Sequence, residues 1–279
     1  MRRSLLTTSL FLLAVPVAAQ SGTTVWSMRM DLADSMQSKV GGLSVIDMRW
    51  TLATDGTRLG FQVDFGPEMA AAMPNMDFSA MRMQAVIHPG GDSVSVGVVL
   101  PPEIAASMGG GIGLRLDMAI PDTIRNPAMP DLDSLMATNQ GQQPSVVNTG
   151  RRSTVAGIAC EEWEVTPQQP DSMPLSGKMQ MCLTDQVPAL RAFTALFERY
   201  MPDLGVDFGE MKEMGRKWFG GRDLVAIRTV IGDNQDIVVQ LESATSTAPD
   251  ASFFVLPEGL QPFPIDMFKG MAAGMQRGT

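Results

Sequence analysis

Apolar and polar residues alternate on both sides of Asp55-Gly56, a dipeptide typical of two-residue hairpin turns. A turn here pairs apolar residues with one another: Ile46 with Phe65, Met48 with Val63, Trp50 with Phe61, and Leu52 with Leu59. The residues between them are polar, namely Asp47, Arg49 and Thr51 on one side and Gln62 and Asp64 on the other. The pattern predicts an antiparallel hairpin with one apolar and one polar face.

A second hairpin is predicted with Gly90-Gly91 at its tip. Its apolar pairs are Ile87 with Val94, Ala85 with Val96, Met83 with Val98, and Met81 with Leu100. Its polar face carries Arg82, Gln84, His88, Ser93 and Ser95. A slip of one residue would expose the methionines, so the register is well specified.

The rest of the chain adds strands and few helices. Residues 26–32 alternate, and a turn at 232–235 brings Ile231 near Ile237 and Ile227 near Leu241. With the cysteine hairpin below, nine strands are predicted, and a sheet this wide must curl or be covered. Helices are expected over 187–201 and 207–218. Segment 101–150, rich in Pro and Gly, is interpreted as a long insertion loop with at most short helical turns.

The chain has only two cysteines, Cys160 and Cys182. A hairpin centred on Asp171 places them directly opposite each other and also pairs Trp163 with Met179 and Glu164 with Lys178, as cross-strand preferences favour. This arrangement predicts a disulfide. A redox pair or two metal ligands are the alternatives, but no Cys-x-x-Cys motif and no further zinc ligands accompany the cysteines.

The N-terminus has the pattern of a cleaved signal peptide. Arg2 and Arg3 precede the apolar stretch 5–17, and Val17-Ala18-Ala19 supplies the small residues for cleavage after Ala19. No later segment is apolar for the length of a spanning helix. We therefore expect a periplasmic or secreted protein, with residues 1–19 removed, a single domain over 20–265 and a flexible tail over 266–279.

Charge and motifs exclude several function classes. The net charge is −9, and −11 without Arg2 and Arg3, so nucleic acid and anionic membrane surfaces are poor partners. His88 is the only histidine, and no Gly-x-Ser-x-Gly turn accompanies it, so it is interpreted as a solvated turn residue. The acid pairs Asp131/Asp133 and Glu161/Glu162 are interpreted as solubilising charges. No catalytic residue and no cofactor is predicted.

The 23 methionines are more informative. Three Met-x-Met pairs, Met28/Met30, Met81/Met83 and Met179/Met181, each place two thioethers on one face of a strand. Flexible, polarisable side chains suit a surface that adapts to a lipid or acyl chain. A core filled with methionine instead of leucine is the plain alternative, and binding of Cu(I) by thioethers is a third.

Two segments resemble an exported bacterial family catalogued as domain of unknown function 4412. Residues 154–163, TVAGIACEEW, are similar to its "t-x-A-G-x-x-C-x-x-aromatic" strand, and residues 252–259, SFFVLPEG, to its closing "F-x-x-P-x-G" segment. That family looks related to the LolA and LppX carriers. The resemblance implies an open antiparallel half-barrel closed by helices, and carriers of this kind bind lipid or lipoprotein acyl chains.

The sequence thus predicts a mainly β, open antiparallel half-barrel with a few covering helices. Its predicted function is non-catalytic binding of an apolar ligand, and the alternative is an envelope structural or interaction module with a packed interior. The predicted apolar face consists of Met28, Met30, Met48, Trp50, Phe61, Val63, Met81, Met83, Val96 and Val98.

Overall fold

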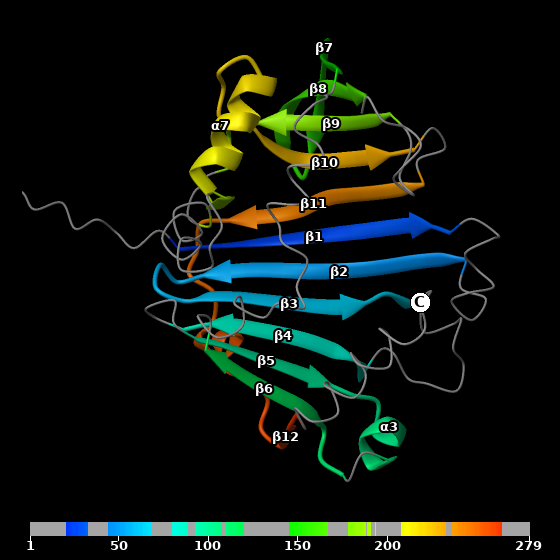
Figure 1. Ribbon diagram of the computed structural model, residues 1–279, viewed down its shortest axis with the longest axis vertical. Coiled ribbons are helices and arrows are strands. Elements are labelled where there is room, and N and C mark those ends of the chain that lie inside the picture. The colour runs from blue at the N-terminus through cyan, green and yellow to red at the C-terminus, as the bar shows by residue number, and fades with distance from the viewer. Residues whose placement is uncertain are drawn as a thin grey trace, which may run out of the picture.

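A computed structural model describes residues 21–32, 44–67, 80–88, 93–107, 110–119, 145–166, 178–187, 189–190, 193, 208–232 and 236–263. These residues form a single sheet with a few short helices (Figure 1). The strands are β1 (Gly22–Asp31), β2 (Val45–Thr54), β3 (Leu59–Phe65), β4 (Arg82–Ile87), β5 (Ser93–Val99), β6 (Gly113–Ala119), β7 (Ser145–Val155), β8 (Ile158–Thr166), β9 (Met179–Thr184), β10 (Val225–Ile231), β11 (Ile237–Thr245) and β12 (Leu260–Pro262). The helices are α3 (Pro102–Ser107), α7 (Phe208–Trp218) and the 3-10 helix η4 (Ala251–Phe254).

Two meanders are joined side by side in this sheet. The order is β12-β6-β5-β4-β3-β2-β1-β11-β10-β9-β8-β7, so β1–β6 form one meander and β7–β11 the other, and β1 pairs with β11 between them. All neighbours are antiparallel except β12, which runs parallel to β6. The sheet curls without closing and ends at β12 and β7, which confirms the predicted open half-barrel. The prediction of nine strands was wrong, because the described residues contain twelve.

The first hairpin differs from its predicted register by two residues. Trp50 pairs with Val63 and Met48 with Phe65, because the turn is a four-residue loop, 55–58, and not a two-residue turn. The Asp55 carboxylate closes the loop by accepting hydrogen bonds from the backbone N–H groups of Thr57 and Arg58, at 2.9 and 2.8 Å. A shift of two leaves every side chain on its predicted face.

The other predicted pairings have mixed outcomes. The second hairpin has its predicted register, with Met83 opposite Val98, and Ile231 pairs with Ile237. In the cysteine hairpin the register is again off by two, and Cys182 lies opposite Glu162. The tips of these hairpins lie outside the described residues.

The interpretation of 101–150 as an insertion loop was wrong where the segment forms strands: residues 113–119 form β6, and β7 begins at Ser145. The helix α3 at 102–107 is a short helical turn of the kind that was expected. The segment β6 does alternate, with Leu114 and Leu116 between polar residues, but three neighbouring glycines hide this short pattern. The proposed domain limits, the signal peptide, Asp131/Asp133 and the tail lie in whole or part outside the described residues and stay predictions.

The polar face is not fully exposed, contrary to prediction. After β11, residues 246–259 cross this face to reach β12, and we call this segment the strap. Its helix η4 lies behind the sheet in Figure 1, and Phe253 and Phe254 of η4, followed by Leu256, pack onto Ala53 and Val86. Gln84 is buried beneath it, and its Nε2 donates to the carbonyl of Phe253 at 2.6 Å.

Glycine makes this close approach possible. A Cβ atom at Gly60 would lie 2.7 Å from Phe253 Cε1, and one at Gly97 would lie 3.2 Å from Leu256 Cδ2 of the strap and 2.8 Å from Leu260 Cδ1 of β12. Arg58 stacks over the Phe254 ring, 4.4 Å from its centroid. Away from the strap the polar face carries exposed ion pairs, such as Arg49 with Glu242 at 2.7 Å.

The largest buried cluster closes one end of the opposite face. It joins Trp26, Leu59, Ile227 and Leu241 to the disulfide and to Leu190 and Phe193. Of the helix predicted over 187–201, residues 189, 190 and 193 are described and helical, and all three are buried. The helix predicted over 207–218 is confirmed as α7, although Trp218 at its end is exposed.

Candidate functional site

All of the predicted apolar-face residues lie on the same side of the sheet, opposite η4. Nine of them are in β1–β5, and Met81 immediately precedes β4. One row runs straight across four strands, from Trp50 through Val63 and Met83 to Val98. A second row joins Phe61 to Val96 through Ala85, and Met28 pairs directly with Met48. The sequence therefore identified one continuous surface, which we call the apolar face.

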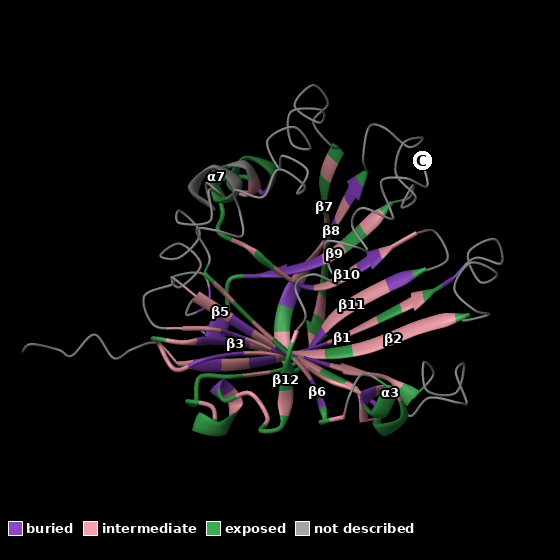
Figure 2. Ribbon diagram, turned by 60° about the horizontal axis from the view of Figure 1, so that its bottom comes forward, coloured by how far each residue is buried: buried purple, intermediate pink, exposed green. Residues whose placement is uncertain are grey.

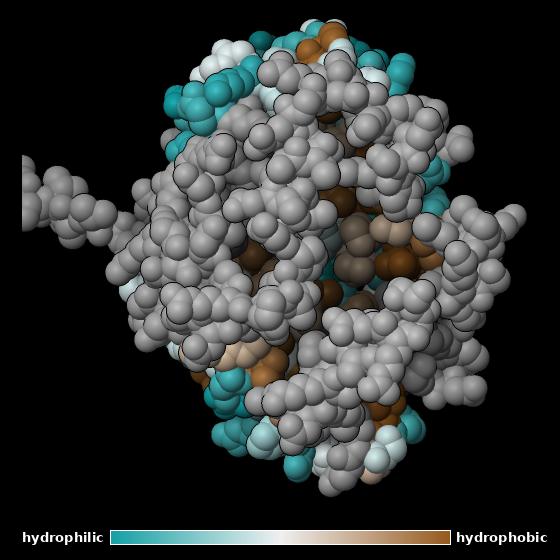
Figure 3. Space-filling model, in the orientation of Figure 1, coloured by the Kyte–Doolittle hydropathy of each residue, from teal (hydrophilic) through white to brown (hydrophobic). Residues whose placement is uncertain are grey.

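The apolar face continues onto both neighbouring strands. Val98 pairs with Leu114 on β6, and Met28 pairs with Val239 on β11. In Figure 3, which looks onto this side, brown apolar residues are visible at the centre of the molecule.

Burial is uneven along this face: it is high at Trp26, lower at the methionines of β1, and high again at Leu32 (9% exposed) and at Ile237, the partner of Met30 (5% exposed). Trp26, at the end closed by Leu190 and Phe193, has 8% of its surface exposed, whereas Met28 and Met30, further along β1, are only half-buried. Of the ten residues of the face, only Val63 is buried, at 5% exposure. In Figure 2, β2 is of intermediate burial along most of its length. The fixed core thus occupies one end of the apolar face and leaves the methionine end partly uncovered.

Two stacked tryptophans mark the boundary between these ends. The rings of Trp26 and Trp50 are nearly parallel, 9° apart, with centroids separated by 6.4 Å. Trp26 Nε1 donates to Thr24 Oγ1 at 3.0 Å, so its polar atom is satisfied inside the sheet. The polar atom of the Trp26 ring is therefore occupied, and the ring contributes aromatic carbon to the stack.

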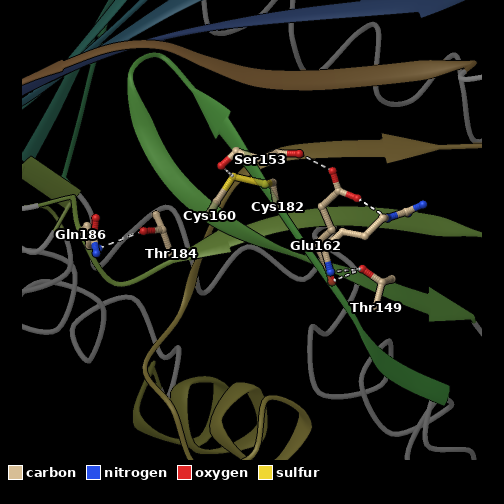
Figure 4. The surroundings of a disulfide bond; sticks show 8 residues. Thr149, Ser153, Cys160, Glu162, Cys182, Thr184 and Gln186 are labelled. Atoms are coloured by element: carbon tan, nitrogen blue, oxygen red, sulfur yellow. Dashed lines mark hydrogen bonds and ion pairs between the residues drawn. A yellow bond between two sulfur atoms is a disulfide. The ribbon is translucent and has the colours of Figure 1, made fainter.

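The disulfide between Cys160 and Cys182 is present, with the Cα atoms 5.4 Å apart (Figure 4). The two residues are diagonal neighbours and not directly opposed, because Cys182 pairs with Glu162. The segment that resembles the exported family is a hairpin and not a single strand. Its Ala156 and Gly157 have φ values of 51° and 77°, which suit a two-residue primed turn between β7 and β8.

The neighbouring acids Glu161 and Glu162 each have their own cation. Arg222 lies 2.6 Å from Glu161, and the resulting hydrogen bond and charge lower the pKa of Glu161. The hydrogen bond from Ser153 and the charge of Arg151 together outweigh burial and lower the pKa of Glu162. Both carboxyl groups are therefore ionised at neutral pH, as solubilising and structural charges would be.

His88 is not the solvated turn residue that the sequence indicated. It is half-buried, with Nε2 2.8 Å from Ser95 Oγ, and the buried Ser95 hydroxyl donates to Asp117 at 2.5 Å. Because Ser95 gives its proton to Asp117, His88 must donate to Ser95 and cannot accept from it. A hydrolytic triad needs the histidine in the middle, and here the serine is in the middle.

The hydrogen bonds from Arg115 and then Ser95 lower the pKa of Asp117, so this carboxylate serves as an acceptor. Beside it, Arg115, Leu116, Leu260, Pro262 and Phe263 line an open hollow of about 230 Å³ between β6 and β12. Sequence reasoning missed this chain of contacts because β6 itself had been missed.

Among the described residues, no three His, Cys, Asp or Glu side chains are placed to hold a metal ion. None of the helices described is long and apolar enough to cross a membrane.

These features define an open β half-barrel with one end filled and one apolar end partly uncovered. No protein family and no curated protein matches the sequence. One solved structure similar to this chain is MucB in complex with MucA(peri), at 10% identity and a TM-score of 0.37, with 88% of this chain and 57% of the MucB chain covered. This chain thus spans a little over half the length of MucB, and a TM-score this low carries no argument about function.

Proposed function

We propose that this chain is an exported, non-catalytic binding protein that holds a lipid or acyl chain against its apolar face. The observation that carries the proposal is that nine of the ten residues of the apolar face are only half-buried, although they form one continuous surface. A packed core would bury most of these side chains, whereas a binding surface leaves room for a ligand over them. We also propose that the chain is related to the exported bacterial family that residues 154–163 and 252–259 resemble.

The shape of the apolar face suits an extended hydrocarbon chain. The row from Trp50 to Val98 crosses four strands, which at about 4.8 Å between strands spans roughly 15 Å. Methionine thioethers flank this row and can adapt to chains of different length and unsaturation.

The ends of the sheet offer little to a partner that would add a strand. The edge strand β12 has three residues and ends in Pro262. In the described part of the chain β7 pairs only with β8, and its register is interrupted between Asn148 and Arg152, beside two exposed arginines. Short, interrupted or charged edges discourage strand addition. Binding through the face of the sheet is therefore favoured over binding through its edge.

A chain-length series tests this proposal. The purified protein is titrated with saturated fatty acids from laurate to stearate, and with a brominated stearate that quenches Trp26 and Trp50. Each buried methylene contributes about 0.8 kcal/mol at most, so affinity should rise several-fold for every two carbons added. Native mass spectrometry of the protein as purified should show an apolar adduct.

Two results would count against an acyl-chain site. Affinity that does not change with chain length would indicate recognition of the carboxylate alone. The absence of binding by every fatty acid, together with an adduct-free protein, would favour the interaction module with a packed interior.

A further inference from the structure

The apolar face has five methionines, and four of them lie within its strands. Met28, Met30, Met48 and Met83 are all half-buried, and Met28 and Met48 are directly opposed on neighbouring strands. Both cysteines of the chain are used in the disulfide. Thioether sulfur is therefore the only sulfur that an oxidant can readily attack in this protein.

We propose that these four methionines are sites of reversible sulfoxide formation, and that their oxidation releases the ligand of the apolar face. This inference rests on the proposed function. In the reaction one oxygen atom passes from a peroxide to each sulfur. The S–O bond forms as the O–O bond breaks, the sulfur loses two electrons, and hydrogen peroxide is reduced to water. The sulfoxide is returned to the thioether by methionine sulfoxide reductases.

The position of these residues explains why oxidation would act on binding. A sulfoxide oxygen is a strong acceptor that needs a hydrogen-bond donor once water is excluded. Within β1–β5, the residues that flank the four methionines on this face are apolar, among them Trp50, Val63 and Phe65. The backbone N–H groups of these strands are engaged in the sheet.

An acyl chain lying on the oxidised face would therefore cover sulfoxide oxygens that have no partner. Water would satisfy the same oxygens on the empty face. Oxidation thus favours the empty state, and the paired positions of Met28 and Met48 concentrate the effect at the methionine end.

The experiment compares the wild-type chain with a variant that carries leucine at all four positions. Leucine has a similar volume and cannot form a sulfoxide. If the quadruple variant does not fold, the double variant M28L/M48L replaces it in the comparison. M181L removes a thioether from the separate cluster around Trp163 and is the matched control.

Each protein is treated with hydrogen peroxide, freed of it, and titrated with the brominated stearate. Sulfoxides are mapped by tryptic digestion. Cleavage at Arg29 separates Met28 from Met30, and Met48 is the only methionine between Lys39 and Arg49.

We expect sulfoxides at the four positions, a loss of affinity of at least about tenfold in the wild type and in M181L, and recovery after the reductases. The quadruple variant should have the same affinity after peroxide as it had before, whatever that starting affinity is. Unchanged affinity of a wild type oxidised at these positions would overturn the inference, as would an equal loss in the quadruple variant. If the untreated proteins do not bind, the proposed function itself fails, and the inference fails with it.

Discussion

Two tryptophan substitutions in one row of the sheet separate a binding face from a packed core. Val63 and Met83 are direct partners on β3 and β4, but Val63 has 5% of its surface exposed and Met83 is half-buried. A tryptophan at Val63 must displace its neighbours, which typically costs about 1–3 kcal/mol of folding free energy. A tryptophan at Met83 can extend over the uncovered end of the face, so its cost should stay within about 0.5 kcal/mol.

Binding should respond in a complementary way. The indole ring of Met83→Trp would occupy the space that an acyl chain needs, so stearate should bind at least about tenfold more weakly. Stability is measured by urea denaturation followed by circular dichroism, and binding by calorimetry, because the added tryptophan complicates fluorescence. Met83→Leu is the control for loss of the thioether and should retain both stability and binding. Equal destabilisation by the two tryptophans, with stearate binding absent in the wild type, would refute the interpretation of this surface as a ligand site.

Four further predictions concern the rest of the molecule. Reduction of the Cys160–Cys182 disulfide opens a loop that spans 22 positions, and it should lower the free energy of unfolding by about 3 kcal/mol without loss of the β signal in circular dichroism. Burial raises the pKa of Asp55, but hydrogen bonds from the backbone and side chains of Arg58 and Thr57 outweigh it and lower the pKa from 3.8 to about 2. The stability from this shift is therefore present above about pH 4 and lost between about pH 4 and 2; it amounts to about 2 kcal/mol, and Asp55→Asn should remove this part of the pH dependence of the urea midpoint. Phe254→Ala should cost about 3 kcal/mol, because the ring anchors the strap, and an unchanged urea midpoint would show that the strap is not part of the cooperative fold. Protein loaded with Cu(I) should lose the metal to a competing chelator, and stoichiometric retention that disappears when the methionines of the apolar face become leucine would instead favour a copper site.

The apolar face was predictable because a strand has a period of two. Two hairpins were predicted two residues out of register, yet Trp50 and Met48 lie on the side that the alternation gave them. An even shift changes the partner of a residue but not its face. The diagonal disulfide has the same explanation, because the strands are close enough for Cys160 and Cys182 to meet with either register.

The strap left a signal in the sequence that alternation alone does not reveal. The polar face was identified from Arg82 and Gln84, and a soluble sheet with such residues was expected to face water. Small residues at Ala53, Gly60 and Gly97 on the same face were the sign that another segment approaches closely. Glycine and alanine on the polar face of a sheet therefore indicate where another segment packs against it, which the polar residues of that face do not reveal.

The difference in burial between Trp26 and Met30 could not be predicted from the strands themselves. Trp26 and Met30 have the same parity on β1 and equally apolar neighbours, so alternation treats them alike. They differ because Leu190 and Phe193, more than 150 residues away in the chain, cover one end of the face. Which apolar residues become core and which remain available to a ligand is decided by that distant contact. A sequence pattern can thus locate a candidate binding face, but the segment that packs against it determines how much of the face can bind.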